Sequence, residues 1–267
     1  MINTIMNARQ NVGNITQEAN AMKSKKIPVG IQLYSLRDVM PKDVPGTLRK
    51  VARMGYEGVE LAGYYNLSGK ELRKMLDDCG LACMGSHTGL NTLEGDAFEK
   101  TVETNKALGT DLLIVPWDDL KDLPKLIERL NAAYQKAKKS GMRMGYHNHA
   151  REFELLEGRT FFDRICEATP KDFLIQLDIG WAAHAGQDVI AILRKHKDRM
   201  LTVHVKESSR TNPAAAVGEG DVNWREVFKM TENEMKLRGY IVEQEKFAIG
   251  PLESAQTCID NIRALIR

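Results

Sequence analysis

The feature that most constrains this chain is a regular alternation between short apolar runs and longer segments with helical period. The first apolar run covers residues 29–35, and the segment 43–55 that follows places apolar residues on one helical face and ends at Gly55. The same alternation recurs along the chain and gives eight strand–helix units. Such a pattern favours a parallel sheet whose strands are covered by helices.

The eight units predict the position of every main element. We expect strands at 29–35, 58–62, 82–87, 111–116, 143–149, 174–180, 200–206 and 240–245. We expect helices at 43–55, 68–79, 95–108, 122–140, 159–168, 187–198, 223–238 and from about 251. Glycines near the helix ends predict C-caps at Gly55, Gly80, Gly109, Gly141 and Gly239.

Eight consecutive units favour an α/β fold of the closed (β/α)8 type, a TIM barrel that forms a single domain over residues 28–267. An open doubly wound sheet would usually carry a glycine-rich phosphate turn after its first strand, and "IQLYSLRD" is not such a turn. Residues 1–27 are predicted to form a polar N-terminal arm outside the barrel.

Composition excludes several classes of protein. The 38 basic and 36 acidic side chains are spread along the sequence, which disfavours a nucleic-acid partner. No apolar run approaches the roughly 18 residues of a membrane span. The first 26 residues lack the apolar core of a secretory signal, so we expect a cytoplasmic protein, and an exported form would require removal of a leader. The oligomeric state stays open and includes a homo-oligomer.

The ends of the predicted strands are rich in polar residues. In a TIM barrel these ends and the loops after them form the active-site mouth. A single polar residue there usually caps a loop, but four of the six histidines fall in this set. The set contains Gln32, Tyr34, Glu60, His87, His147, His149, Asp178, His204, Lys206, Glu243 and Glu245. Because strand residues two apart share a face, pairs such as His147 and His149 can both face the mouth.

Four of these residues form a candidate metal site. They supply two imidazoles and two carboxylates from the ends of four consecutive strands: His147, Asp178, His204 and Glu243. Mixed nitrogen and oxygen ligands suit Mn, Co, Zn or Fe better than Ca. The sequence therefore predicts one divalent ion at the mouth.

Other residues near the strand ends are candidates for binding a substrate. All three tryptophans follow strands, and the flat faces of Trp117, Trp181 and Trp224 could line a pocket for a sugar. The predicted substrate-binding residues are Gln32, Tyr34, Glu60, His87, Trp117, Trp181 and Lys206. The long connection 208–223 contains the flexible "GEG", which suits a lid and a passive surface loop equally well.

Several motifs resemble one known family. "IQLYSLRD", "GYEGVELAG", "GYHNHAREFE", "LDIGWAAHAGQD", "VHVKE", "VGEGDVNW" and "IVEQE" occur in the order found in the sugar phosphate isomerase/epimerase family, which has a xylose-isomerase-like TIM barrel. The resemblance covers about residues 28–266. It implies one divalent metal held by Glu, Asp, His and Glu, with the glutamates moving protons beside a carbonyl. In this chain Asp178, His204 and Glu243 match three of those ligands.

The fifth strand departs from the family pattern. Many members carry Glu-Asn-His there, whereas this chain has His147-Asn148-His149 and so resembles an HNH-containing branch. His147 would be the first ligand, and one acid/base carboxylate is missing. His149 and Glu152 are the nearest replacement bases, and Glu152 could instead be a further ligand. With Glu243, they are the predicted catalytic residues.

The resemblance implies a metal-dependent isomerase or epimerase that removes a proton next to the carbonyl of a sugar or keto-sugar. His149 or Glu243 would take the proton, while Lys206 and Gln32 position oxygens. Two alternatives stay open. One is keto-sugar lyase, dehydratase or hydratase chemistry, similar to inosose dehydratases or 3-keto-glycoside lyases, and the other is a non-catalytic sugar-binding barrel. No phosphate-cradling turn is evident, so a phosphorylated substrate is not assumed.

Overall fold

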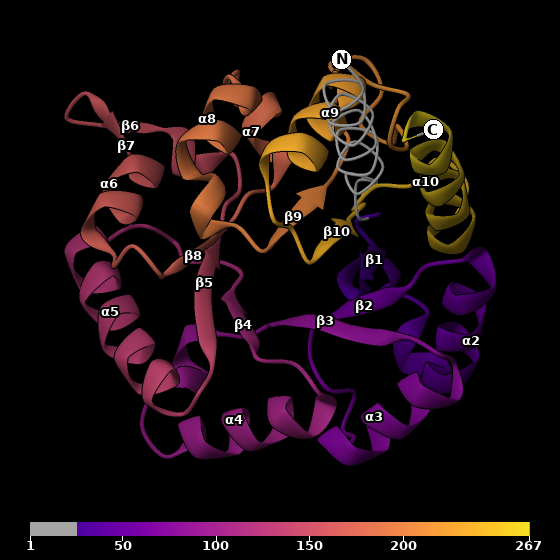
Figure 1. Cartoon of the computed structure of the whole chain (residues 1–267), viewed down its shortest axis with the longest axis horizontal. Helices are drawn as coiled ribbons and strands as arrows, with labels where there is room; N and C mark the ends of the chain where they lie inside the picture. The colour runs from indigo at the N-terminus through magenta and orange to yellow at the C-terminus, as the bar shows by residue number, and fades with distance from the viewer. Residues whose placement is uncertain (1–25, 267) are drawn as a thin grey trace, which may run out of the picture.

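The computed structural model describes residues 26–266, which form an eight-stranded parallel barrel surrounded by helices (Figure 1). The strands are hydrogen-bonded in the order β8-β5-β4-β3-β2-β1-β10-β9. The first and last strands of this order meet through a bridge between Asp178 and His204, where His204 N donates to Leu177 O at 2.8 Å. The predicted single-domain TIM barrel is confirmed, and the predicted arm lies almost entirely outside the described residues.

The observed elements follow the predicted ones closely. The barrel strands are β1 (Val29–Gln32), β2 (Gly58–Leu61), β3 (Ala82–His87), β4 (Leu112–Val115), β5 (Arg143–His147), β8 (Leu174–Gln176), β9 (Thr202–Val205) and β10 (Gly239–Val242). The α-helices are α2 (Val44–Met54), α3 (Gly69–Asp78), α4 (Ala97–Leu108), α5 (Leu123–Lys139), α6 (Phe161–Ala168), α7 (Ile179–His184), α8 (Val189–His196), α9 (Trp224–Glu234) and α10 (Pro251–Leu265). Within residues 26–266, a short hairpin, β6 (Leu155–Leu156) and β7 (Arg159–Thr160), and five 3-10 turns complete the list: η1 (Leu33–Leu36), η2 (Met40–Lys42), η3 (Leu90–Leu93), η4 (Arg151–Phe153) and η5 (Lys197–Arg199).

Several strands end earlier at the mouth than predicted. β1 ends at Gln32 because its side chain accepts a hydrogen bond from Tyr34 N at 3.1 Å and starts the turn η1. β8 ends at Gln176 because Asp178 caps α7, a helix that the pattern did not predict. The hairpin after β5 was also not predicted. In each case a polar side chain or a local turn ends the strand before its apolar pattern does.

Four of the five predicted glycine caps have a left-handed backbone: Gly55, Gly80, Gly109 and Gly141. The prediction is wrong for Gly239, because α9 ends at Glu234 and Gly239 is the first residue of β10. A Cβ on Gly239 would lie 3.1 Å from Met84 Sδ, and Cβ atoms on Gly30 and Gly58 would lie 2.5 and 2.8 Å from the same side chain. These glycines therefore make room for Met84 inside the barrel.

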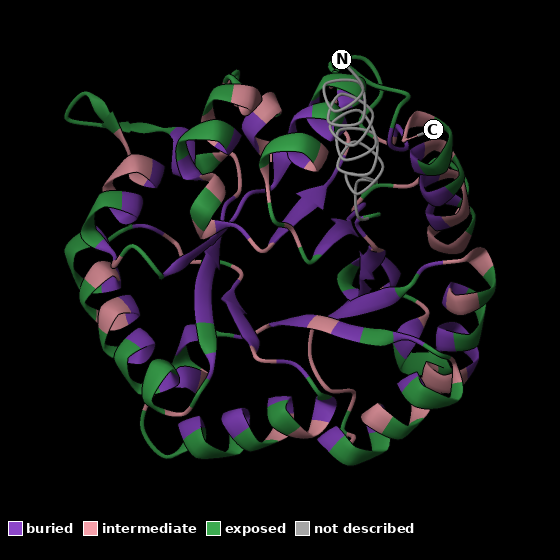
Figure 2. Cartoon of the chain, viewed as in Figure 1, coloured by how far each residue is buried: buried purple, intermediate pink, exposed green. Residues whose placement is uncertain are grey.

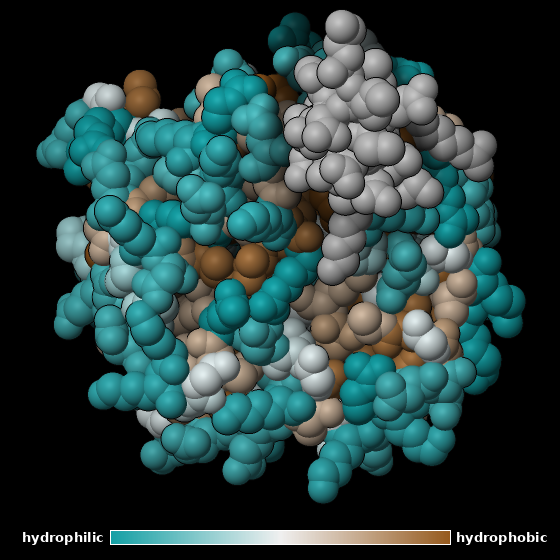
Figure 3. Space-filling view, viewed as in Figure 1, coloured by the Kyte–Doolittle hydropathy of each residue, from teal (hydrophilic) through white to brown (hydrophobic). Residues whose placement is uncertain are grey.

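Buried residues fill the barrel strands and the helix faces that turn toward them, while the outer helix faces are largely exposed (Figure 2). The buried apolar residues form two clusters, as expected for a barrel with helices outside. On β4, Leu113 and Val115 join the large core shared with the helices, whereas Leu112 and Ile114 join a small cluster with Leu174. Alternation along the strand places this small cluster inside the barrel. In the space-filling view, hydrophilic side chains dominate the outer ring (Figure 3). Within residues 26–266, no helix has the length and apolar character needed to cross a bilayer.

Candidate active site

The structure brings the four predicted metal ligands together at the mouth of the barrel. His147 ends β5, Asp178 follows β8, His204 lies in β9 and Glu243 follows β10. All four are buried, and one possible ligand atom from each lies within 4.8 Å of the others. We refer to these four residues as the ligand cluster.

Asp178 carries the strongest sign that the ligand cluster fits a cation. Its Oδ1 accepts a hydrogen bond from Trp181 N at 2.8 Å, but its Oδ2 is buried and has no hydrogen-bond partner among the described residues. His147 Nε2 and His204 Nδ1 each lie 3.9 Å from Oδ2. Burial raises the pKa of Asp178 to about 7. A buried carboxylate oxygen without a partner is costly, and a divalent ion among these donors would remove that cost.

His204 lies between two carboxylates. It donates from Nδ1 to Glu243 Oε2 at 2.9 Å and from Nε2 to Glu60 Oε2 at 2.7 Å. Burial alone would lower its pKa, but the two carboxylates raise the pKa of His204 to about 10. The bond to Glu60 fixes the ring so that Nδ1 faces the ligand cluster, which is how a carboxylate commonly orients a metal-binding histidine.

His147 is oriented in the same way by an amide. Its Nδ1 donates to Gln176 Oε1 at 3.2 Å, and His87 Nε2 donates to the same oxygen at 2.8 Å. The other nitrogen of His147 then faces Asp178. Burial keeps the pKa of His147 well below its usual range, so the imidazole is neutral and able to act as a ligand.

Directly behind the ligand cluster lies a hydrogen-bonded group that we call the support layer, formed by Gln32, Glu60 and Gln176. Gln176 Nε2 donates to Glu60 Oε1 at 2.6 Å and to Thr202 Oγ1 at 2.9 Å, while Gln32 Nε2 donates to Glu60 Oε2 at 2.8 Å. Burial would raise the pKa of Glu60, but His87 and His204 hold it well below its usual range.

The support layer changes how two predicted substrate-binding residues are interpreted. Gln32 and Glu60 are completely buried and their polar groups contact protein partners, which favours a role in positioning His204 over contact with substrate. Sequence reasoning missed Gln176. The sequence did indicate it, because Gln176 lies two residues before Asp178 in the predicted strand 174–180 and is therefore expected on the same face.

The structure separates the two predicted replacement bases. Glu152 is buried, its Oε1 accepts from Tyr146 Oη at 2.8 Å, and its Oε2 accepts from His149 N at 2.8 Å. It does not belong to the ligand cluster. Within the described part of the chain, neither ring nitrogen of His149 has a hydrogen-bond partner, and burial lowers the pKa of this imidazole. The arrangement favours His149 as the base and Glu152 as its anchor.

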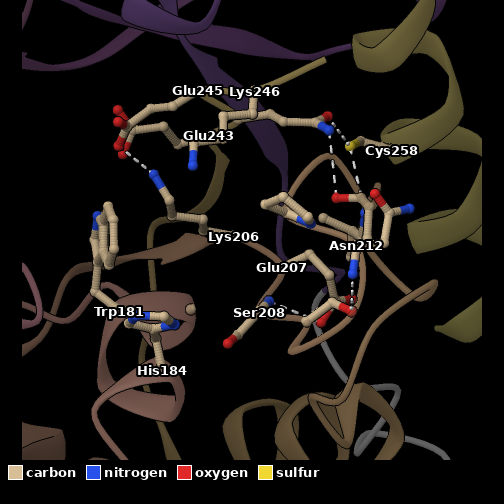
Figure 4. Close-up of a pocket in the computed structure, with 16 residues that line it drawn as sticks. Trp181, His184, Lys206, Glu207, Ser208, Asn212, Glu243, Glu245, Lys246 and Cys258 are labelled. Atoms are coloured by element: carbon tan, nitrogen blue, oxygen red, sulfur yellow. Dashed lines mark hydrogen bonds and ion pairs between the residues drawn. The ribbon is translucent and has the colours of Figure 1, made fainter. Parts of the chain in front are cut away.

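Lys206 and Trp181 form one wall beside the ligand cluster (Figure 4). Lys206 Nζ lies 4.6 Å from the centroid of the Trp181 ring and forms an ion pair with Glu245. Burial would lower the pKa of this amine, but Glu243, Asp178 and Glu245 raise it. Lys206 therefore holds a positive charge next to the place where the ligand cluster would bind an ion.

Two neighbouring cavities open onto the site. The larger has a volume of about 460 Å³ and is lined by predicted residues from several strands: Tyr34, His87, Trp117, His147, His149 and Glu243. The smaller has a volume of about 120 Å³ and lies beside Trp181, Lys206 and the loop 208–223. Glu243 and Glu245 line both cavities. The predicted binding residues are thus divided between two spaces.

The expectation that Trp224 lines a sugar pocket is wrong. Its side chain is buried at the start of α9, stacks on Phe228 and lines neither cavity. Its Nε1 donates to Glu207 Oε2 at 2.7 Å. Trp224 is therefore a core residue that helps to fix Glu207, a residue that sequence reasoning did not single out.

Glu207 also organises the loop 208–223, for which the sequence left a lid and a passive loop open. Its carboxylate accepts backbone N–H groups from Ser208 at 2.9 Å, Gly218 at 2.7 Å and Val222 at 3.3 Å. Val217 is buried, and its N–H donates to Cys258 Sγ of α10 at 3.5 Å. These contacts favour a fixed wall of the smaller cavity over a mobile lid.

Comparison with known proteins agrees with this geometry. An inosose dehydratase from Clostridium perfringens is 23% identical over 255 residues, which cover 78% of this chain and 85% of that protein. The structure of a sugar phosphate isomerase/epimerase from Parabacteroides distasonis matches 91% of this chain and all of its own, with a TM-score of 0.77 and 26% identity. A 3-keto-D-glucoside 4-epimerase from E. coli shares the fold, with a TM-score of 0.64 and 16% identity over 90% of this chain and 100% of its own.

The family model described as "Xylose isomerase-like TIM barrel" matches residues 48–265. The match spans most of the chain and contains all four residues of the ligand cluster. It agrees with the family resemblance of the motifs, while the assignment to an HNH-containing branch stays a prediction. The chain belongs to the xylose isomerase-like TIM barrel family.

Proposed function

We propose that this protein is a metal-dependent enzyme that removes a proton next to the carbonyl of a sugar or keto-sugar, and so isomerises or epimerises it. The observation that carries the proposal is the buried Oδ2 of Asp178, which has no hydrogen-bond partner in residues 26–266 and lies 3.9 Å from a ring nitrogen of His147 and of His204. A mixed cluster of this kind at the mouth of a TIM barrel suits catalysis by a divalent ion.

The ligand cluster would hold one ion, with Mn, Co, Zn and Fe as the candidates. A bound divalent ion supplies a Lewis acid that polarises a carbonyl and stabilises the negative charge that develops on its oxygen. His149 then accepts the α-proton, because its neutral imidazole lines the larger cavity and is free of protein hydrogen bonds in the described part of the chain. Glu243 lines the same cavity and is the alternative base.

Other residues would position the substrate and the base. Glu152 accepts the backbone N–H of His149 and so holds the imidazole in place. Lys206, whose pKa is raised, would donate a hydrogen bond to a substrate oxygen beside the ligand cluster. Glu60 and Gln176 would keep His204 and His147 in the orientation that ion binding requires.

A second candidate is dehydration, which is supported by the similarity to the inosose dehydratase from Clostridium perfringens. The first step is the same: His149 accepts the α-proton and the C–H electrons form the enolate. The enolate electrons then form a carbon–carbon double bond as the β C–O bond breaks. Lys206 would protonate the departing hydroxide to give water.

The two reactions are separable by proton NMR in D₂O, with an inosose and a 3-keto-glucoside as substrates and with Mn²⁺-loaded protein. Isomerase or epimerase chemistry predicts deuterium at the α-carbon and retention of every oxygen. Dehydration predicts a new vinylic signal. His149→Gln should slow exchange by roughly 10²- to 10⁴-fold with metal content unchanged. Sugar binding without exchange in metal-loaded protein would instead support a non-catalytic barrel.

A further inference from the structure

The outer part of the larger cavity is built from exposed aromatic rings. Tyr34 is 46% exposed and Trp117 is 62% exposed, and both line this cavity. The other large apolar side chains that are exposed in the described chain, Leu155, Leu156 and Ile249, do not line it. Exposed aromatic surface at the edge of a cavity that also contains ionisable groups indicates a ligand-binding role for these rings.

Both rings belong to loops that are held in place. Arg37 lies over the Tyr34 ring at 4.7 Å from its centroid and donates to the carbonyls of Tyr34 at 3.0 Å and Glu245 at 2.7 Å. Trp117 precedes a turn in which Leu120 N donates to Asp118 Oδ1 at 2.9 Å, and the Leu120 side chain is buried. A ligand that stacks on these rings would therefore lose little free energy in ordering the loops.

The lining of the larger cavity favours an uncharged ligand over an anion. Two carboxylates, Glu243 and Glu245, line it, and none of the described residues that line it is a lysine or an arginine. The guanidinium of Arg37 is already bonded to two carbonyls. A phosphate group held against the aromatic rings would therefore have no lysine or arginine of this lining to pair with.

We infer that the larger cavity binds an uncharged aryl glycoside, with the sugar ring next to the ligand cluster and the flat aglycone against Trp117 and Tyr34. The assignment of the inner part rests on the proposed function, whereas the outer part rests on the aromatic rings and the charge of the cavity. A cavity volume of about 460 Å³ lies within the range of pockets that bind drug-sized ligands. Offset stacking on an aromatic face supplies the preference for a flat aglycone.

Unreactive glycosides test this inference without requiring turnover. Phenyl β-D-glucopyranoside, methyl β-D-glucopyranoside and glucose 6-phosphate would be titrated calorimetrically into Mn²⁺-loaded protein, with saturation-transfer NMR of the phenyl protons. We expect the phenyl glycoside to bind at least about fivefold more tightly than the methyl glycoside, which corresponds to about 1 kcal/mol. Glucose 6-phosphate should bind more weakly than either.

Trp117→Ala should reduce the phenyl preference to less than about twofold while leaving methyl glycoside affinity and metal content unchanged. Trp117→Phe should retain most of the preference, and Leu155→Ala, a matched change at an exposed apolar residue outside the cavity, should retain all of it. The inference is overturned by equal affinities for the two glycosides, by tightest binding of glucose 6-phosphate, or by absence of transfer to the phenyl protons. It is also overturned if Trp117→Ala leaves the phenyl preference unchanged but alters the molecular mass of the protein in light scattering, because Trp117 would then contact another copy of the chain and not the ligand.

Failure of this inference and failure of the proposed function give different results. A phenyl preference that depends on Trp117 in protein that exchanges no α-proton would support the aromatic subsite and argue against the enzyme. Exchange of the α-proton of a keto-sugar, together with equal binding of phenyl and methyl glycosides, would support the enzyme and argue against the aromatic subsite.

Discussion

The support layer and the ligand cluster are adjacent inside the barrel, but they differ in how completely their polar atoms are satisfied. In the support layer, both oxygens of Glu60 and both polar atoms of the Gln176 amide have protein partners. In the ligand cluster, Asp178 Oδ2 is just as deeply buried and has none among the described residues. A layer whose polar atoms all have hydrogen-bond partners can fix side-chain orientation, whereas a buried oxygen without a partner is available to bind an ion.

This difference explains why the barrel carries so many polar groups in its interior. Buried polar networks stabilise a fold only when they are fully connected, and the support layer meets that condition. Its connections end at the histidines of the ligand cluster, so the layer transmits a fixed orientation to His147 and His204. If the two layers also differ in function, substitutions in the ligand cluster should affect metal binding more than substitutions in the support layer.

The largest effect is expected for Asp178→Asn. The asparagine can still accept from Trp181 N and cap α7, but it removes the charge that faces the two histidines. We expect Mn²⁺ affinity, measured by calorimetry, to fall by more than about 100-fold, beyond the usual effect of residues that only orient ligands. Asp188→Asn is the matched control, because Asp188 caps α8 by the same contact to Ala191 N and should leave affinity unchanged. Near-normal Mn²⁺ affinity in Asp178→Asn would show that Asp178 is not a metal ligand.

A smaller loss is expected for Glu60→Gln in the support layer. The change weakens the bond to His204 Nε2 and places an amide N–H against donors, so the ring loses its fixed orientation. Metal affinity should fall by about 10- to 100-fold, with one ion still bound per chain at saturation. Glu57→Gln, in the turn before the same strand, should have no effect on metal affinity. A loss as large as that of Asp178→Asn would show that Glu60 is itself a ligand.

Metal affinity should also rise with pH. Without metal, the pKa of His204 is raised to about 10 by its two carboxylates, so the ion must displace a proton at any pH below that value. Asp178, with a pKa raised to about 7 by burial, adds a second proton below neutrality. We expect about a tenfold gain in affinity from pH 7 to pH 8 and a steeper change below pH 7. Titrations in buffers with different ionisation enthalpies should detect proton release, and pH-independent binding would contradict this.

The smallest effect is expected for Glu152→Gln. Glu152 resembles the support layer, since both of its oxygens are bonded to protein donors. The substitution should slow α-proton exchange by less than about tenfold, because the imidazole of His149 stays present. If Glu152 were the base, the loss would be about 10²- to 10⁴-fold. Comparison with His149→Gln under the same conditions decides between the two residues.

The sequence predicted the barrel and the ligand cluster because both follow from local order. Alternating apolar runs define the strands, and parallel strands bring their ends to one mouth, so Asp178, His204 and Glu243 meet although they are far apart in sequence. What the sequence did not predict depends on neighbours across the barrel. Gln176 and Glu60 are 116 residues apart, and their hydrogen bond cannot be inferred from either strand alone.

The same limit explains the remaining differences. Trp117 follows its strand as predicted, whereas Tyr34, predicted within the first strand, lies just after it in η1. Only the folded chain shows that the two rings share a cavity whose described lining contains no lysine or arginine. Glu152 lies in the 3-10 turn η4, which directs its carboxylate back to His149 N. Glu207 binds backbone groups of a loop whose course the sequence does not specify.

The most direct test of the difference between the two layers is the position of a bound ion. Crystals soaked in Mn²⁺ would be measured by anomalous diffraction at the manganese edge. We predict a single peak within ligand distance of His147, Asp178, His204 and Glu243, with Glu60 and Gln176 unmoved behind it. A peak at the neighbouring group of His87, His147 and His204, or no peak beside Asp178, would contradict the assignment.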